Sequence, residues 1–310
     1  MAGEPALLFR HVRRTFGQTV ALDRLDLAVP PGIVLGLVGR NGAGKTTALR
    51  LAHGHLWPDA GEIRVLGLDP RRDPLAVRRR VALMSEENHL CPWMTVEEIT
   101  WFAGRLHPCW DADLAQQLRR RLDLPARSRI RSLSRGGRAR VALLLAVAAC
   151  PELLLLDDPT SGLDPLARRD VLEELLAVLV AEGRTVAWAS HLVHDLERVA
   201  DRIAVIDAGR VVLEEDVEAL KNRVRGVTAV FPAGAPDPEV LPGRLRARRD
   251  GRVLEGVSDA PPDELVARLR AAGARTVDLR PLALEEILVA RLGPTAAPAD
   301  EPDRKETIHA

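Results

Sequence analysis

The amino-acid sequence predicts an α/β fold with a buried parallel sheet, and two patterns support this prediction. In the first, the continuous apolar run IVLGLVG at residues 33–39 fits a strand buried on both faces. It leads through a glycine-rich turn into the helical pattern KTTALRLAHGHL at residues 45–56. In the second pattern, three more strand signals appear after residue 150, and a helical pattern at residues 166–183 lies between the first two of these strands. These later strand signals are LLLLDD at 153–158, TVAWAS at 185–190 and RIAVIDAGRVV at 202–212.

Two segments before the apolar run are typical of half-buried strands. ALLFRHVRRTFG at residues 6–17 and VALDRLDLAVPPG at residues 20–32 alternate loosely between apolar and polar residues. Gly17 and the run from Pro30 to Gly32 mark where each strand ends. We therefore expect a second, partly exposed sheet at the start of the chain.

Residues 88–150 lose the strand signal and show helical spacing instead. The helical patterns are TVEEITWFAGRLH at 95–107, DADLAQQLRRRLDL at 111–124 and GGRARVALLLAVAAC at 136–150. This part of the chain predicts a helical subdomain inserted into the α/β fold.

The character of the sequence changes again near Gly226. Residues 226–293 show a short β, β, β, α, β, α pattern, which predicts a small separate α+β domain after a first domain of residues 6–222. The last residues, 294–310, are rich in alanine, proline and acidic residues and predict a disordered tail.

Composition and charge limit the possible functions. Lys plus Arg equals Asp plus Glu, at 44 each, so no overall field attracts the chain to nucleic acid, and the basic runs lack interleaved aromatic residues. Cys91, Cys109 and Cys150 lack metal-ligand spacing and indicate reduced thiols of a cytosolic protein. The longest apolar stretch, 141–156, is interrupted by Pro151 and Glu152, so we expect any membrane role to be peripheral.

The stretch GRNGAGKTT, Gly39 to Thr47, fits the phosphate-loop pattern G-x-x-x-x-G-K-[ST] and stands between a predicted strand and a predicted helix. Backbone N–H groups of such a loop face phosphate oxygens, and the helix N-terminus favours negative charge. We expect Lys45 to reach the β- and γ-phosphates and Thr46 to ligate Mg²⁺. The residues assigned to the nucleotide here are Gly39, Arg40, Asn41, Gly42, Ala43, Gly44, Lys45, Thr46 and Thr47.

The stretch LSRGG, Leu133 to Gly137, begins a predicted helix about twenty residues before the LLLLDD strand. With the phosphate loop, it makes residues 6 to about 222 resemble the ATP-binding subunit of an ABC transporter, whose signature reads L-S-x-G-Q. The resemblance implies a P-loop fold of the ABC ATPase type, in which two copies enclose ATP head to tail. Ser134, Gly136 and Gly137 would then contact the γ-phosphate held by the partner copy.

The same resemblance assigns four further residues. Asp157 matches the aspartate that holds Mg²⁺ through water, and Asp164 in SGLD matches the aspartate at the dimer contact. His191 in WASHL matches the histidine that contacts the γ-phosphate and orients the attacking water. Phe16 stands where the family stacks an aromatic ring on adenine, although an ordinary core position remains the alternative.

Three positions depart from the family pattern. Glu86 stands where the family has a glutamine, Gly137 replaces the signature glutamine, and Asp158 replaces the catalytic glutamate. Glu86 can still offer an oxygen to Mg²⁺, but it adds negative charge near the γ-phosphate. Aspartate is one methylene shorter, and a misplacement of about 1 Å can cost on the order of 100-fold in rate. Asp158 is therefore either a slower but working general base, or the chain pairs with a different ATPase subunit that supplies the better site.

The function implied is that of the cytoplasmic ATPase subunit of an ABC transporter, similar to those of bacterial ABC-2-type exporters. It would bind to the inner face of the membrane through a separate transmembrane permease and form a homodimer or a heterodimer. The permease would dock between the Glu86 loop and the helical subdomain, where Trp93 and Met94 are either contacts or core residues. The alternatives are a non-transport ABC ATPase that acts as an ATP-driven dimerisation switch, and a degenerate nucleotide-binding subunit.

Overall fold

The structure is a computed structural model that describes residues 4–87, 89–169, 171–173 and 184–293. The chain divides into two compact units, Met1–His191 with Val199–Glu214, and Leu192–Arg198 with Glu215–Ala310. The second unit thus starts before the boundary expected near residue 226. The tail predicted at 294–310 and the end of the helix predicted at 166–183 lie outside the described residues.

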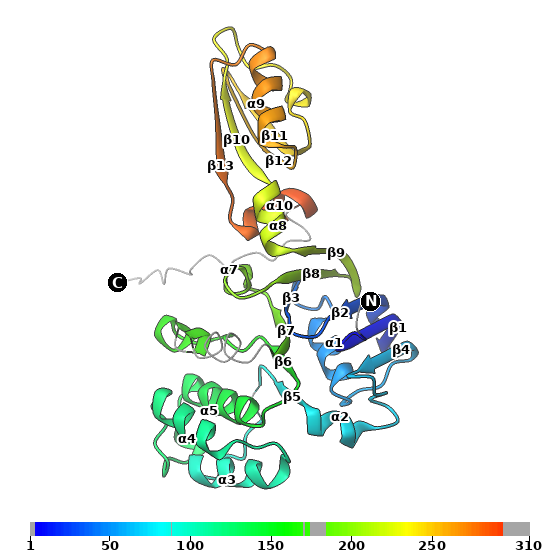
Figure 1. Ribbon diagram of the computed structural model, residues 1–310, viewed down its shortest axis with the longest axis vertical. Coiled ribbons are helices and arrows are strands. Elements are labelled where there is room, and N and C mark those ends of the chain that lie inside the picture. Colours follow the sequence, from blue (N-terminus) through cyan, green and yellow to red (C-terminus); the bar gives the residue numbers. More distant parts are fainter. Residues whose placement is uncertain (1–3, 88, 170, 174–183, 294–310) are drawn as a thin grey trace, which may run out of the picture. The chain divides into compact units, whose positions relative to one another are not determined.

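A six-stranded sheet forms the centre of the first unit, in the order β5-β6-β7-β3-β8-β9 (Figure 1). Neighbouring strands from β5 to β8 pair in parallel, and every residue of β3, β6 and β7 is buried, as the continuous apolar runs predict. The carboxyl ends of these parallel strands therefore meet at one edge of the sheet. The strands are β3 (Val34–Val38), β5 (Val81–Met84), β6 (Leu153–Asp157), β7 (Thr185–Ser190), β8 (Arg202–Asp207) and β9 (Arg210–Asp216).

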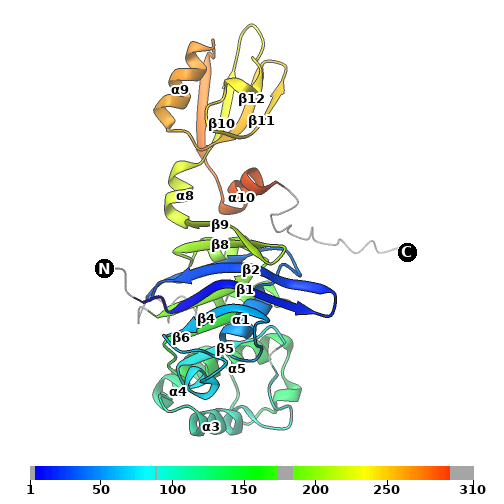
Figure 2. The ribbon, with the colours of Figure 1, turned by 90° about the vertical axis from the view of Figure 1, so that its right-hand side faces the viewer.

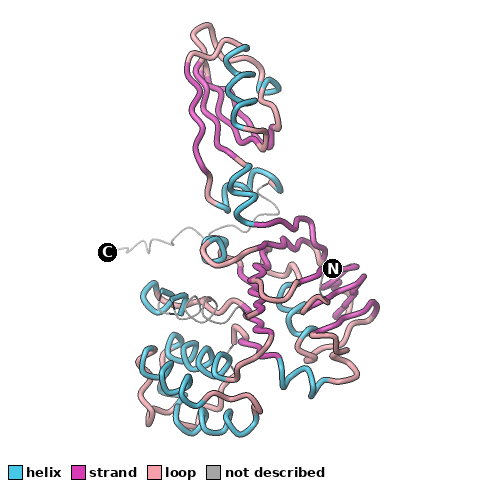
Figure 3. Tube along the Cα trace, in the orientation of Figure 1, coloured by secondary structure: helices cyan, strands magenta, loops and turns pink. Residues whose placement is uncertain are grey.

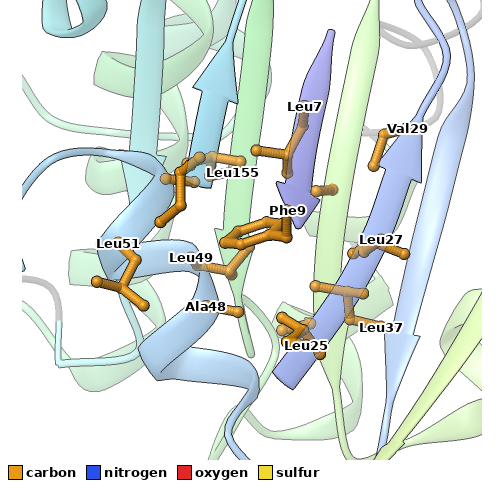
Figure 4. Close-up of a cluster of buried hydrophobic side chains, with 14 of the residues drawn as sticks. Leu7, Phe9, Leu25, Leu27, Val29, Leu37, Ala48, Leu49, Leu51 and Leu155 are labelled. Atoms are coloured by element: carbon orange, nitrogen blue, oxygen red, sulfur yellow. The ribbon is translucent and has the colours of Figure 1, made fainter. Parts of the chain in front are cut away.

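The second sheet of this unit is antiparallel, in the order β2-β1-β4, with β1 (Leu7–Phe16), β2 (Thr19–Val29) and β4 (Ala60–Val65) (Figure 2). Its inward side chains pack with helix α1 (Lys45–Ala52) and with the central sheet in one apolar cluster. Figure 4 shows Phe9 among leucines from these elements. Helix α1 ends earlier than predicted, because Gly54 adopts a left-handed conformation with φ of 72°. Helix α2 (Pro74–Arg80) leads into β5.

The region expected to be helical contains helices α3, α4 and α5 and the short 3-10 helix η1, which Figures 1 and 3 show on one side of the central sheet. Thr95, Asp111 and Ser134 cap the three α-helices by accepting hydrogen bonds from backbone N–H groups. Among the described residues, no helix is long and apolar enough to cross a membrane. The bounds are α3 (Val96–Leu106), α4 (Ala112–Arg121), η1 (Ile130–Ser132) and α5 (Arg135–Ala148).

The second unit contains a four-stranded antiparallel sheet in the order β11-β12-β10-β13. Helix α9 buries Leu265 and Leu269 against Val227, Ala229 and Leu254 of the sheet. The order β10, β11, β12, α9, β13, α10 confirms the predicted pattern, and the fold class is confirmed with it. The bounds are α7 (Val193–Glu197), α8 (Val217–Arg223), β10 (Arg225–Val230), η2 (Pro238–Val240), β11 (Arg244–Asp250), β12 (Val253–Ser258), α9 (Pro262–Ala271), β13 (Thr276–Pro281) and α10 (Leu284–Leu292).

Candidate functional site

The glycine-rich loop between β3 and α1 has a backbone that requires glycine. Gly44 adopts φ of 111°, and a Cβ atom there would lie 2.5 Å from the carbonyl oxygen of Ala21. A Cβ atom at Gly39 would lie 2.4 Å from the carbonyl oxygen of Ile206. Helix α1 then begins without a side-chain cap and without an acidic residue in its first turn. Its N-terminal N–H groups are suited to an anion.

Lys45 is buried at the start of this helix. Its Nζ donates hydrogen bonds to the carbonyl oxygens of Gly39 at 2.7 Å and Arg40 at 3.3 Å, so the side chain folds back along the loop. Burial lowers the pKa of the Lys45 ammonium, although the carboxylates of Asp158, Asp157 and Glu86 oppose the shift. The ammonium has three N–H donors, and two of them meet backbone carbonyls.

Asp157 ends β6 and joins the phosphate loop to the central sheet. Its Oδ1 accepts a hydrogen bond of 2.8 Å from the hydroxyl of Thr46, which is the second residue of α1. Burial raises the pKa of the Asp157 carboxyl, while the bond from Thr46 works against the rise. The structure therefore brings together a hydroxyl and a carboxylate, which are oxygen ligands of the kind that Mg²⁺ prefers.

Asp158 and His191 form a hydrogen-bonded pair where β6 and β7 end. Oδ1 of Asp158 lies 2.8 Å from Nδ1 of His191 and 3.1 Å from its backbone nitrogen. An ionised carboxylate can only accept, so Nδ1 carries the proton in this pair. Asp158 adopts a left-handed conformation with φ of 44°, which aspartate tolerates better than most residues.

The protonation of this pair follows from its contacts. Burial would raise the pKa of the Asp158 carboxyl, but the hydrogen bonds and charge of His191, with the charge of Lys45, outweigh it and lower the pKa. The hydrogen bond to Asp158 raises the pKa of the His191 ring, although burial opposes this rise. Asp158 is therefore a charged but weak base, since a base works best when its pKa is near the operating pH.

Glu86, two residues beyond β5, contacts two groups that were not predicted from the sequence. Its Oε1 accepts a hydrogen bond of 2.9 Å from the hydroxyl of Ser161 and lies 3.8 Å from Nη2 of Arg135. The Arg135 guanidinium lies so close to Gly162 that a Cβ atom on this glycine would be 2.3 Å from it. For these two contacts of Glu86 the sequence contains only weak signals: the hydroxyl of Ser161 beside the glycine of SGLD, and the arginine within LSRGG.

The residues predicted to face a partner copy make local contacts of their own. Ser134 caps α5 by accepting from the N–H of Gly137 at 3.0 Å, and Asp164 accepts from the N–H groups of Leu166 and Ala167 in the helical segment that begins at Pro165. Gly136 lies close to that helix, because a Cβ atom there would be 3.1 Å from the Ala167 side chain. In the described part of the chain, no hydrogen bond or ion pair joins Ser134, Gly136 or Asp164 to Lys45, Asp157 or Asp158.

Phe16 lies at the end of β1 with 45% of its surface exposed, so it is not the ordinary core residue of the alternative interpretation. The guanidinium of Arg14 lies 4.7 Å from the centroid of the Phe16 ring and makes a cation–π contact with it. An exposed aromatic ring of this kind can stack on a planar base.

The sequence is similar to those of proteins that have been characterised elsewhere. A family model described as "ABC transporter" matches residues 22–161. The Nod factor export ATP-binding protein I of Cupriavidus metallidurans is 34% identical over 297 residues, which cover 93% of this chain and 97% of that protein. This chain belongs to the ABC transporter family. It is the ATP-binding member that the phosphate loop and the signature predict.

Other relatives place the chain within the ABC transporter family more broadly. The daunorubicin resistance ATP-binding protein DrrA3 of Streptomyces coeruleorubidus is 37% identical over 228 residues, covering 72% of each chain. The methionine import ATP-binding protein MetN of Rhizobium johnstonii is 34% identical over 286 residues, covering 87% of this chain and 79% of that protein. A solved structure of an "ATP binding subunit of ABC transporter" is 25% identical, with a TM-score of 0.64, over 70% of this chain and 92% of that one. These likenesses confirm the ABC ATPase fold.

A cavity with a volume of about 880 Å³ lies beside the Glu86 loop. Leucines and three arginines, Arg50, Arg78 and Arg79, line it, and the leucines are Leu56, Leu75, Leu83, Leu90, Leu106 and Leu145. Neither Trp93 nor Met94 lines this cavity: Trp93 is 65% exposed, and Met94 is half-buried with its carbonyl bonded to Ile130. His53 lines the same cavity, and burial lowers its pKa to about 3, so this side chain is neutral near pH 7.

Proposed function

We propose that this chain hydrolyses ATP and couples the reaction to export through a separate membrane permease. The observation that carries the proposal is the convergence of Lys45, the Thr46–Asp157 pair and the Asp158–His191 pair at the carboxyl edge of the central sheet. Export is supported by two of the relatives, whose names refer to Nod factor export and to daunorubicin resistance.

The loop fits a magnesium–nucleotide complex. Gly44 and the uncapped start of α1 provide donors for phosphate oxygens, and Lys45 could exchange its carbonyl partners for the β- and γ-phosphates. Among the described residues no group of three or more His, Cys, Asp or Glu could hold a metal ion. This suits Mg²⁺, which usually binds through one or two protein ligands together with phosphate and water. We assign Thr46 and Asp157 to it, with Glu86 as a further oxygen donor; the ion would neutralise phosphate charge.

Asp158 is the proposed general base. His191 is assigned to the γ-phosphate and the attacking water, and its hydrogen bond to Asp158 also orients the base. Asp158 would accept a proton from the water that attacks the γ-phosphorus atom, while the His191 ring holds the carboxylate in place through Nδ1. Two features favour slow turnover. The side chain is one methylene shorter than glutamate, and the contact with His191 keeps its pKa low.

Ser134, Gly136, Gly137 and Asp164 are assigned to a second ATPase subunit, identical or different. They are small or capping residues next to the exposed start of α5, where N–H groups and a hydroxyl could contact a phosphate held by another subunit. The other contacts assigned to the nucleotide are Phe16, which would stack on adenine, and the loop residues Arg40, Asn41, Gly42, Ala43 and Thr47.

Replacing Ser134 with arginine should leave ATP binding by the isolated subunit nearly unchanged and prevent ATP-dependent dimerisation. The larger, charged side chain would stand at the contact that the phosphate of the other subunit requires. Light scattering with ATP in the non-hydrolysing Asp158→Asn background would measure the dimer. Ser132→Arg, which adds the same group to another exposed serine, is the control and should still dimerise. Equal loss of ATP binding and dimerisation in Ser134→Arg would contradict the head-to-tail arrangement.

We assign the cavity beside the Glu86 loop to the permease. Its apolar side chains could receive the hydrophobic face of a partner helix, and Arg78 and Arg79 favour carboxylates at the edge of that helix. The chain would then act at the inner face of the membrane without spanning it.

The function is tested by two measurements on the full chain. We expect phosphate release from ATP in the presence of Mg²⁺, and co-purification with a multi-span membrane protein from detergent-solubilised membranes. Phosphate release by a chain that co-purifies with no membrane protein would favour a soluble ATP-driven switch. An absence of phosphate release, alone and with the partner, would exclude the ATPase.

A further inference from the structure

The sheet of the second unit has a face that α9 does not cover. Side chains alternate between the faces of a strand, so residues next to the buried Val227, Ala229 and Leu254 point away from α9. On that opposite face lies a hollow with a volume of about 520 Å³. Pockets of this size hold small organic molecules.

One row of residues crosses the sheet through this hollow. Strand pairing places Arg246 of β11 opposite Val257 of β12, Val257 opposite Gly226 of β10, and Gly226 opposite Arg280 of β13. The row therefore has an arginine at each end, about 14 Å apart at the backbone, with small or apolar residues between them. Gly226 has no side chain to fill the hollow, and a Cβ atom there would lie only 3.0 Å from Cγ of Arg280.

The next row carries one positive and two negative side chains. It runs from Arg248 through Glu255 and Thr228 to Asp278, and Arg248 is paired with Glu255 through Nε at 2.8 Å and Nη2 at 2.5 Å. Asp278 does not line the hollow. The lining residues thus supply three guanidiniums against the single carboxylate of Glu255.

The guanidiniums retain N–H donors that the protein does not use. Arg280 donates to Glu286 through Nη1 at 3.2 Å and Nη2 at 2.6 Å, which leaves its Nε–H, and Arg248 retains its Nη1. The side chain of Arg246 makes no hydrogen bond or ion pair with any residue in the described ranges. Glu255 and Glu286 hold two arginines in fixed orientations, and the third is available to a ligand.

We propose that this hollow binds a small organic anion with two anionic groups, such as a dicarboxylate or a carboxylated phosphate ester. One anionic group would meet Arg246 and Arg248 on β11, and the other would meet Arg280 on β13, while the apolar body lies over Gly226 and Val257. Guanidiniums suit both chemistries because they donate two parallel hydrogen bonds to a carboxylate or a phosphate. The site is separate from the ATPase residues, which all belong to the first unit.

The test uses the full chain labelled with ¹⁵N, titrated with succinate or with inorganic phosphate at constant ionic strength. The backbone amides of Gly226 and Thr228 report the hollow, and the amides of Gly42 and Gly44 report the phosphate loop separately. We expect at least one of the two anions to shift the first pair saturably. Succinate alone would identify a dicarboxylate site, phosphate alone a phosphate site, and no saturable shift with either would overturn the proposal.

Two variants separate a built site from general attraction. Arg246→Ser should weaken the binding about tenfold, because it removes charge-assisted hydrogen bonds. Arg249→Ser is the matched control: Arg249 is exposed on the same strand and pairs with Leu254, so it points to the other face of the sheet. Its binding should equal that of the parent chain. Equal weakening in both variants would show that only net charge matters and would overturn the proposal.

Discussion

Replacing Asp158 with asparagine should slow ATP turnover by about 100- to 10,000-fold, which is the usual cost of losing a general base. Asparagine keeps the shape of the side chain and its ability to bond to the His191 backbone nitrogen, so the loss would be chemical. Steady-state phosphate release measures the rate, and size-exclusion chromatography with ATP should show an accumulated ATP-bound dimer. An Asn variant as fast as the parent would mean that Asp158 is not the base.

The same variant has a second readout that does not depend on turnover. Removing the carboxylate charge should lower the raised pKa of His191, which an NMR titration of the imidazole resonances measures. In the parent chain the protonated ring stabilises the fold below its usual pKa of 6.5, and this contribution is lost as pH rises through the folded-state pKa. The free energy of unfolding of Asp158→Asn should therefore fall less than that of the parent chain as pH rises from 6.5 through the folded-state pKa of His191.

Asp158→Glu tests whether the short side chain limits the reaction. Restored reach should raise the turnover rate, if the glutamate carboxylate can still bond to His191. The left-handed backbone at this position, with φ of 44°, favours aspartate over glutamate. A Glu variant no faster than the parent would therefore indicate a turn built around the shorter residue.

Lys45→Ala should abolish measurable hydrolysis and weaken ATP binding by about 10- to 100-fold, because the phosphates lose charge-assisted hydrogen bonds from a buried cation. Isothermal titration calorimetry measures the affinity, and phosphate release measures the rate. The chain has only three lysines, so Lys221→Ala is a matched control that removes an ion pair with Glu197 far from the phosphate loop in sequence. Parent-like hydrolysis in Lys45→Ala would refute the assignment of the loop.

The elements that were predictable have long or strongly patterned sequences. The buried strands β3, β6 and β7 follow from continuous apolar runs, and α3, α4 and α5 follow from helical spacing and from side-chain caps. The strand β5 was not predicted because its four residues directly follow the arginines that end α2. Helix α1 was predicted too long, since the HGH segment continues the helical spacing although Gly54 turns left-handed.

The candidate site was predictable where a chemical rule fixes neighbours along the chain. The phosphate loop requires its glycines and Lys45 at set positions, and Asp157 stands at the end of a recognisable strand. Contacts between distant segments were harder. The Asp158–His191 bond spans 33 positions, and the contact of Glu86 with Ser161 spans 75, so neither has a local pattern. No spacing rule leads from the Glu86 loop to Arg135.

The strand order β6-β7-β3 also determines how the site keeps its dimensions. Ala189 of β7 pairs with Asp157 on one side, and Ser190 pairs with Val38 on the other, so β7 is a spacer of two strand widths, about 9.6 Å. That width depends on backbone hydrogen bonds and hardly on the side chains of β7. The phosphate loop after β3 and Asp157 at the end of β6 are thus held at a fixed distance from each other. Side-chain exchanges within β7 should leave this distance unchanged, whereas one inserted residue would disturb the strand pairing and pull Thr46 away from Asp157.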